Sequence, residues 1–161
     1  MKHLKNYTLI FLIIVLLFTS VACVTVKKTA ITVNDFCTKT SELGCEQIEL
    51  EIEDETLASI IKESAYVTKE TPDGVLLAEF YIANNSSSAQ AIISGTKHAA
   101  NDLCEDQQTS VSKSGSNFSY YKITNYNIVC ILSNVDNTIV YIRADKALES
   151  EADEIIKAIG Y

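Results

Sequence analysis

The sequence predicts an α+β domain, in which two or three helices pack on a mainly antiparallel sheet of five or six strands. Three observations predict this class. An apolar run over residues 75–83 follows a turn sequence with proline and glycine at residues 71–74. Apolar side chains then recur at helical spacing over residues 89–103. Finally, residues 118–143 contain three strand-like runs that polar turns of hairpin length separate.

The elements before this hairpin are short. Residues 31–44 contain two cysteines and are predicted to form a loop. Residues 48–53 alternate isoleucine or leucine with glutamate, which is the period of a strand with one apolar and one acidic face. Asp54 and Glu55 suit the start of a short helix over residues 56–62, because negative charge is stabilised at the positive end of the helix dipole.

A hairpin and a long helix form the middle of the predicted domain. Residues 66–70 and 75–83 have strand composition on either side of the turn. Residues 84–88 break the second strand and offer N-cap side chains for a helix that continues to about Glu105. Gly95 weakens this helix, since an interior glycine costs about 1 kcal/mol relative to alanine. Its buried face is expected to consist of Ala89, Ile92, Ile93, Thr96, Ala99, Ala100 and Leu103.

An exposed loop and three strands follow. The loop is predicted over residues 106–116, which are polar. The strands are expected over residues 118–124, 128–132 and 138–143. The middle strand is apolar throughout, which is typical of a strand that is covered on both faces.

A terminal helix completes the predicted domain. Asp145 can cap it, and Gly160 lies where it would end. Its buried stripe is expected to consist of Leu148, Ala152, Ile155 and Ile159. This order of hairpin, long helix, three strands and terminal helix is similar to that of the exported PsbP/DcrB-like domains. The similarity concerns the order of elements alone, and it assigns no functional residue.

The N-terminus has the organisation of an export signal. Two lysines precede an almost unbroken apolar run over residues 7–18, and small residues follow within residues 20–22. Charge, apolar core and small residues in this order are typical of a secretory signal. The chain therefore divides into a signal peptide or membrane anchor at residues 1–22, a tether at residues 23–30 and a single exported domain at residues 31–161.

The residues at the end of the signal, Ser20-Val21-Ala22-Cys23, carry a second indication. They resemble the lipobox of bacterial-type lipoproteins, although serine stands where that family usually has leucine. The resemblance implies that Cys23 carries a lipid, which would hold the domain at the cell membrane on its extracytoplasmic side. Two alternatives use the same segment. Cleavage could release a soluble protein, or residues 6–26, which carry no charge, could span a hydrocarbon core of about 30 Å as an uncleaved anchor.

The expected mature chain is strongly acidic. Without residues 1–22, 11 basic residues stand against all 21 acidic residues, which gives a net charge of −10. So acidic a surface argues against nucleic acid as a partner and against electrostatic docking on anionic lipid. The sequence shows no cluster of basic residues beyond Lys27 and Lys28.

Four further cysteines support export. Cys37, Cys45, Cys104 and Cys130 are an even number, and an exported domain can use them as two structural disulfides. The short spacing suits a bond between Cys37 and Cys45, which leaves Cys104 to pair with Cys130. Free buried thiols are the alternative. A zinc or redox site is disfavoured because the closely spaced cysteine pairs of such sites are absent.

Residues that could support catalysis are few. His98 is the one histidine of the expected mature chain, and it falls on the polar side of the long helix. Glu49, Glu51 and Glu53 form the densest acidic row. Calcium prefers carboxylate oxygens, but a tight calcium site needs a loop that surrounds the ion, which a flat row of glutamates does not provide. The three glutamates are therefore expected to lie on a solvent-exposed face of the strand. The common nucleotide, hydrolase and metalloprotease motifs are absent from the sequence, and no metal or cofactor is expected.

Tyrosines give the one indication of a binding surface. Tyr120, Tyr121, Tyr126 and Tyr141 fall in or between the last three predicted strands. Aromatic residues with a polar tip often line interfaces or sugar-binding surfaces. Ordinary packing on the sheet is the alternative interpretation of the same residues.

The sequence therefore favours a non-catalytic, membrane-tethered lipoprotein domain that binds a protein partner or supports an envelope assembly. The alternative is a tethered enzyme or metal-dependent domain that uses the acidic residues of 49–53 or His98. Convergence of these residues in one pocket would favour the enzyme, whereas an open patch rich in tyrosine would favour binding.

Overall fold

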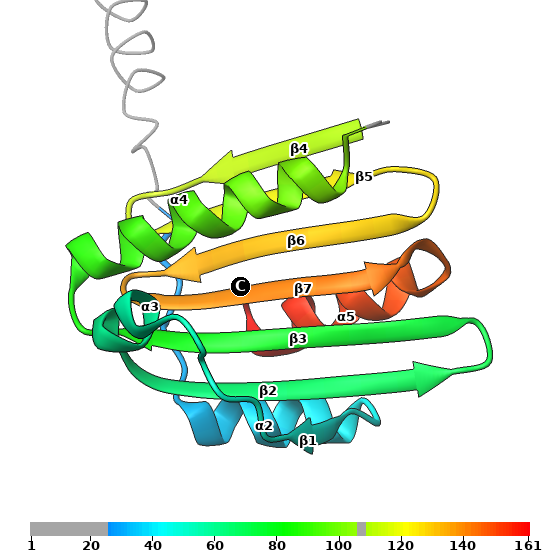
Figure 1. Cartoon of the computed structure of the whole chain (residues 1–161), viewed down its shortest axis with the longest axis horizontal. Coiled ribbons are helices and arrows are strands. Elements are labelled where there is room, and N and C mark those ends of the chain that lie inside the picture. Colours follow the sequence, from blue (N-terminus) through cyan, green and yellow to red (C-terminus); the bar gives the residue numbers. More distant parts are fainter. Residues whose placement is uncertain (1–25, 106–108) are drawn as a thin grey trace, which may run out of the picture.

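The computed structural model describes residues 26–105 and 109–161, and within them seven strands form one sheet (Figure 1). The order across the sheet is β1-β2-β3-β7-β6-β5-β4, and every neighbouring pair is antiparallel. The strands are β1 Glu46–Ile48, β2 Ile61–Thr71, β3 Gly74–Ala83, β4 Thr109–Ser114, β5 Phe118–Thr124, β6 Ile128–Val135 and β7 Thr138–Asp145.

Four helices pack on this sheet in the described part of the chain. They are α2 Val33–Glu42, α3 Glu55–Ile60, α4 Ser86–Leu103 and α5 Glu149–Ile159, and a short 3-10 turn, Lys146–Leu148, precedes the last. Helices α2 and α5 cover one face of the sheet, and α3 and α4 lie on the other (Figure 1). The α+β class and the antiparallel sheet are confirmed, but the predicted counts of strands and helices are too low.

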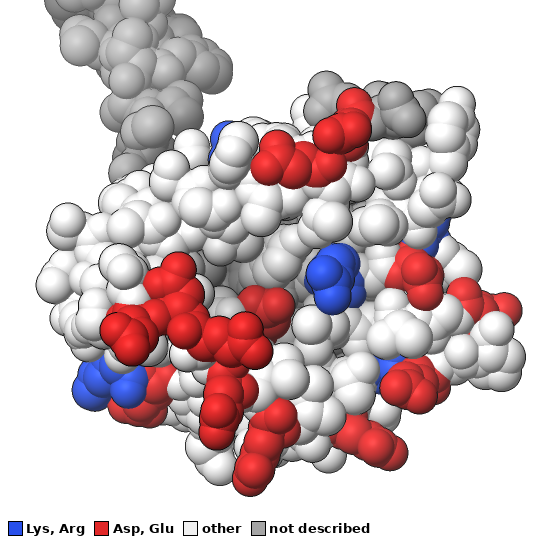
Figure 2. Space-filling view, in the orientation of Figure 1, with Lys and Arg blue, Asp and Glu red and all other residues white. Residues whose placement is uncertain are grey.

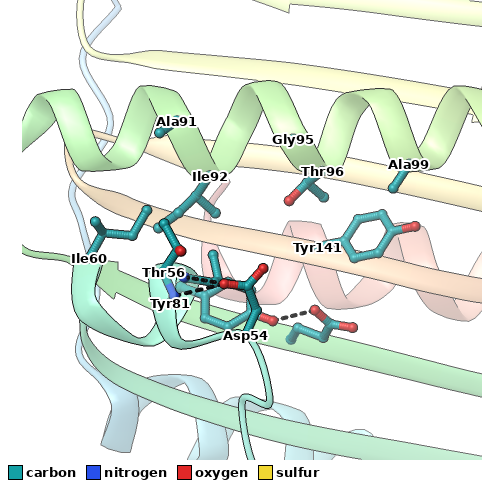
Figure 3. Close-up of a pocket in the computed structure, with 12 residues that line it drawn as sticks. Asp54, Thr56, Ile60, Tyr81, Ala91, Ile92, Gly95, Thr96, Ala99 and Tyr141 are labelled. Atoms are coloured by element: carbon teal, nitrogen blue, oxygen red, sulfur yellow. Dashed lines mark hydrogen bonds between the residues drawn. The ribbon is translucent and has the colours of Figure 1, made fainter.

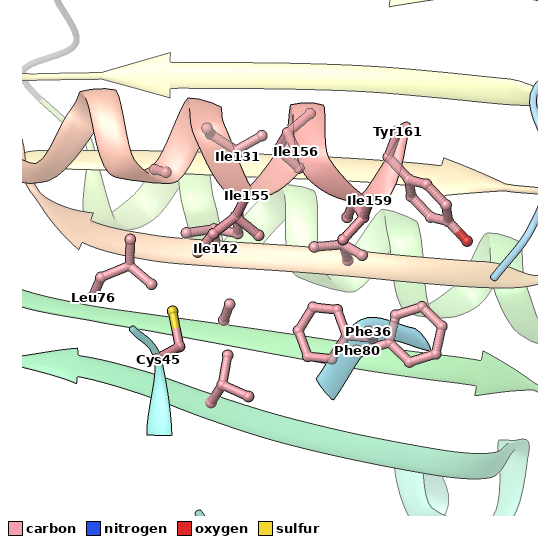
Figure 4. Close-up of a cluster of buried hydrophobic side chains, with 14 of the residues drawn as sticks. Phe36, Cys45, Leu76, Phe80, Ile131, Ile142, Ile155, Ile156, Ile159 and Tyr161 are labelled. Atoms are coloured by element: carbon pink, nitrogen blue, oxygen red, sulfur yellow. The ribbon is translucent and has the colours of Figure 1, made fainter. Parts of the chain in front are cut away.

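The face under α2 and α5 forms a hydrophobic core (Figure 4). Phe36 on α2 stacks on Phe80 of β3, with ring centroids 5.0 Å apart and planes inclined by 16°. Ile155 on α5 and Ile142 on β7 belong to the same cluster. Strand β6 is buried on both faces, as its apolar sequence predicted, because it lies between β7 and β5 with a helix on each side.

Helix α2 corrects the prediction of a loop over residues 31–44. The helix begins at a capping box in which Thr32 and Asp35 satisfy each other's backbone N–H groups. Phe36 and Thr40 lie one turn apart on its buried face. Because only a narrow stripe of this helix is apolar, the pattern is weak in the sequence, and the capping residues are its clearest indication.

The predicted strand over residues 48–53 is also wrong beyond its first residue. Strand β1 pairs with β2 only up to Ile48, after which the chain leaves the sheet edge and crosses to α3. Residues 49–54 therefore have no strand partner. Ile52 packs inward, whereas the three glutamates between Ile48 and Asp54 are exposed.

Strand β4 lies within the segment that was predicted to be a loop. Each of its six residues is exposed, since β4 is an edge strand that pairs only with β5. An edge strand of this kind buries no face, so its sequence contains no apolar alternation. Thr109–Ser114 could not be distinguished from a loop by composition.

The C-terminal helix largely agrees with prediction. All four residues of its expected stripe are buried, and Gly160 ends it with φ of 83°. Asp145 does not cap it, because its carboxylate instead accepts a hydrogen bond from the backbone N–H of Val75 at 2.8 Å. The described residues include no helix with the length and apolar character needed to cross a bilayer. The signal segment and Cys23 lie outside the described residues.

Substitution of Phe36 tests the contribution of α2 to the core. We expect Phe36→Ala to lower the free energy of unfolding by about 3–5 kcal/mol, since it leaves a cavity against Phe80. Tyr126→Ala is the control, because that side chain is 77% exposed and its loss should change stability by less than about 0.5 kcal/mol. Urea unfolding measures both, and equal midpoints for the two variants would contradict the packing of α2 described above.

Candidate functional site

An open groove of about 420 Å³ lies on the α3 and α4 face of the sheet (Figure 3). Its floor consists of residues from β3 and β7. Helix α4 forms one wall, and α3 with the residue before it forms the other. The lining residues are Asp54, Thr56, Leu57, Ile60, Glu79, Tyr81, Ala91, Ile92, Gly95, Thr96, Ala99 and Tyr141.

A carboxylate lies on the floor of this groove among tyrosines. Glu79 and Tyr81 are two residues apart on β3, so they face the same side of the sheet. The Tyr81 hydroxyl donates a hydrogen bond to Glu79 Oε2 at 2.5 Å. Strand register places Tyr66 and Tyr141 directly opposite Glu79 on its two neighbouring strands. The rings of Tyr66 and Tyr81 meet edge to face, with centroids 5.9 Å apart.

Burial dominates the electrostatics of the floor. Burial raises the pKa of Glu79, and the hydrogen bond from Tyr81 and the positive charge of Arg143 oppose that rise. Burial and the neighbouring groups also raise the pKa of Tyr81 and of Tyr141, so both phenols stay protonated and can donate hydrogen bonds. The groove thus presents one partly desolvated carboxylate beside neutral phenols.

The walls of the groove are apolar and include a glycine. Leu57 and Ile60 on α3 and Ile92 on α4 line the groove and belong to one hydrophobic cluster. A Cβ atom added at Gly95 would meet no atom within 4 Å, so packing does not require glycine there. An interior helix glycine costs about 1 kcal/mol relative to alanine. Its effect in this position is to keep the groove wide.

The acidic residues predicted from the sequence lie beside the groove. Figure 2 shows the face hollowed between α4 and the α3 side, where acidic side chains gather. Glu49, Glu51 and Glu53 are exposed in the segment that leads to α3. Asp54 lines the groove, but its carboxylate is engaged in capping α3 through the N–H groups of Thr56 and Leu57.

His98 does not join these acids. It lies on the exposed side of α4, where its ring is 3.5 Å from the carboxylate of Asp102, and it is not among the lining residues. Within residues 26–105 and 109–161, no three acidic, histidine or cysteine side chains gather as a metal site would require. The predicted alternative of an enzyme site built from Glu49–Glu53 and His98 therefore lacks the convergence that it needs.

The four tyrosines do not form one patch. Tyr120 and Tyr121 are neighbours on β5 and so point to opposite faces of the sheet. Tyr121 donates a hydrogen bond to Asn101 of α4 at 2.7 Å. Tyr126 is exposed in the turn after β5, and Tyr141 alone reaches the groove. The sequence did indicate one groove residue, but it missed Glu79 and Tyr81, whose clearest signal is a single charge inside the apolar run of β3.

The four cysteines are free thiols in the structure. Cys104, at the end of α4, lies against Cys130 of β6, and Tyr141 donates a hydrogen bond to Cys130 Sγ at 3.5 Å. Burial, together with the adjacent Cys130 thiol, raises the pKa of Cys104 to about 11. Cys37 and Cys45 lie against the core on the other face, where burial raises the pKa of each.

Comparison with known proteins adds little to this site. No protein-family model and no curated protein matches the chain. One similar solved structure is that of a GTP binding regulator from Thermotoga maritima, with a TM-score of 0.49 and 11% sequence identity. The match covers 78% of this chain and 87% of that chain. At this level of similarity, it assigns neither a ligand nor a functional residue.

The contact between Cys104 and Cys130 predicts a stabilising disulfide under oxidising conditions. The bond would close a loop of about 25 residues, which is worth roughly 3 kcal/mol in the chain-entropy model. Cys104→Ala should therefore lower the melting temperature of the oxidised protein more than Cys37→Ala, because the predicted bond between Cys37 and Cys45 would close a much shorter loop. Thiol titration of the unfolded, unreduced protein from its native compartment should find none of the four free. Two or more free thiols would defeat this prediction.

Proposed function

We propose that the chain is a membrane-tethered, extracytoplasmic lipoprotein domain that binds its partner through the groove between α3 and α4. The observation that supports the binding role most directly is Glu79, a partly buried carboxylate that accepts a hydrogen bond from Tyr81. A carboxylate in an apolar groove loses solvation, and this loss is recovered when a ligand supplies a charge or a donor. Binding is therefore the role that best explains the residue.

The chemistry of the groove defines the partner. Apolar walls fit an apolar body, and Glu79 with Tyr81 and Tyr141 fits a cationic or hydrogen-bond-donating head. Aromatic rings add to the attraction of a cation. The partner is thus an organic ammonium group on an apolar stem. It can be a small molecule or a lysine-like side chain of an envelope protein.

A non-catalytic role agrees with the residues that surround the groove. General acid–base catalysis needs a positioned acid or base and a second group that activates or stabilises. Glu79 is the one lining carboxylate without a capping role, and the phenols beside it stay protonated. The second candidate function is an enzyme that uses Glu79 as its acid or base. A substrate that the wild type turns over and Glu79→Gln does not would establish this function.

The tether is tested by the state of Cys23. Mass spectrometry of protein extracted from its own membrane should find Cys23 as the N-terminus with several acyl chains, since one chain anchors only marginally. Cys23→Ser should move the protein from the detergent phase to the aqueous phase. An N-terminus at Met1, or an unmodified Cys23 in a soluble product, would contradict the lipoprotein proposal.

Short alkyl probes test the groove. Butylammonium, butanol and butanoate share a stem but differ in their heads, and butylammonium should perturb the NMR signals of the Tyr81 and Tyr141 rings at the lowest concentration. Gly95→Leu should remove this binding, because its side chain fills open space, while it leaves stability unchanged or raises it by about 1 kcal/mol. Ser94→Leu is the matched control, since residue 94 is exposed on α4 and does not line the groove.

The pH dependence of butylammonium binding tests the role of the Glu79 carboxylate. Butylammonium requires ionised Glu79, so its affinity should fall as pH is lowered through the pKa of this group. Because burial raises that pKa, the loss should begin at higher pH than for an ordinary carboxyl. Glu79→Gln should weaken binding about tenfold or more and remove the pH dependence. Equal binding of butanoate and butylammonium would contradict the proposed head group.

A further inference from the structure

A second charged site lies on the α2 and α5 face, where the described chain begins. The backbone N–H of Lys28 donates to Asn117 Oδ1 at 3.1 Å, and Asn117 Nδ2 donates to the carbonyl of Lys28 at 2.9 Å. These two bonds fix the end of the tether to the turn between β4 and β5. The position of Lys28 is therefore set by the fold and not by the tether alone.

Two lysines lie over two aromatic rings at this point. Lys28 Nζ is 4.7 Å from the centroid of the Phe118 ring, and Lys113 Nζ is 5.9 Å from that of Tyr120. Phe118 and Tyr120 share a face of β5, since they are two residues apart. Together they border a cleft of about 320 Å³, which Lys157 also lines.

The two ammonium groups lack counterions among the described residues. Burial and the positive charge of Lys113 lower the pKa of Lys28, which indicates that the two charges repel each other. Neither lysine has a carboxylate within 4.0 Å in the described part of the chain. Asp153 lines the cleft, but it pairs with Lys122 Nζ at 2.7 Å. A bound anion would relieve the repulsion.

We propose that Lys28 and Lys113 bind the anionic headgroups of the membrane to which the chain is tethered. This inference rests on the proposed lipid at Cys23, which is five residues before Lys28. Five residues span at most about 18 Å, so the cleft stays within that distance of the proposed lipid anchor. Anionic headgroups supply the charge that the cleft lacks. The sequence did not predict that Lys28 and Lys113 lie at the same cleft, because they are 85 residues apart.

The test uses the full wild-type chain reconstituted into vesicles. One set contains phosphatidylcholine alone, and the other contains phosphatidylcholine with phosphatidylglycerol. Acylation by an amine reagent, quantified by mass spectrometry, reports the exposure of each lysine. We expect anionic vesicles to slow the acylation of Lys28 and Lys113 about threefold or more, and high salt to remove this protection. Lys62 and Lys69, on β2 near the opposite edge of the sheet, are the internal controls.

A variant and two further outcomes complete the test. A probe attached at Val111, which is exposed on the same face of β4 as Lys113, should report closer contact with anionic lipid in the Lys62→Gln/Lys69→Gln control than in Lys28→Gln/Lys113→Gln. Equal acylation of Lys28 and Lys113 in both vesicle types would overturn the proposal. So would equal protection by inorganic phosphate in phosphatidylcholine vesicles, which would indicate a free-anion site. Protein that fails to float with either vesicle type would instead refute the tether.

Discussion

Close packing of α2 and α5 over the central strands on one face of the sheet allows the other face to stay partly open. Helices α2 and α5 bury one side of β3 and β7 in a hydrophobic core, with the Phe36–Phe80 stack between α2 and the sheet. Because this layer is close-packed, the sheet holds its shape without a full second layer. The short α3 and the small residues of α4 then leave a groove over the same strands. One strand, β3, thus supplies Phe80 to the core and Glu79 to the groove.

The presence of Glu79 is not explained by the requirements of the fold. Its neighbours across the sheet are Tyr66 and Tyr141, and an apolar residue would pack between them without loss of solvation. The hydrogen bond from Tyr81 offsets part of that loss, yet burial still raises the pKa of the carboxyl. Perturbed carboxyls gather at functional sites for this reason. Gly95 also indicates that the groove has a function, since it keeps open a space that a larger residue could fill.

Those parts of the fold that bury a continuous apolar pattern could be predicted from the sequence. The strand around Cys130 and the stripe of α5 are of this kind. Cys104, which was expected to pair with Cys130, lies beside it in the structure as a free thiol. Strand β4 buries no residue and α2 buries only a narrow stripe, so neither segment shows a clear periodicity of apolar residues in the sequence. Strand β1 ends at Ile48 although its partner β2 continues beyond Tyr66 to Ile61, and the alternation of residues 48–53 does not encode this end.

The groove around Glu79 and the cleft with Lys28 and Lys113 both depend on contacts between residues that are distant in the sequence. Composition reports a strongly acidic chain, and residues 23–161, with a net charge of −10, are repelled by an anionic bilayer. Attraction at Lys28 and Lys113 acts only within about one Debye length, roughly 10 Å, of the headgroups. Orientations that bring other surfaces to the membrane are therefore opposed, whereas the orientation that presents the lysine cleft is favoured. The groove lies on the other face of the sheet, so the proposed orientation leaves it accessible to the proposed cationic partner.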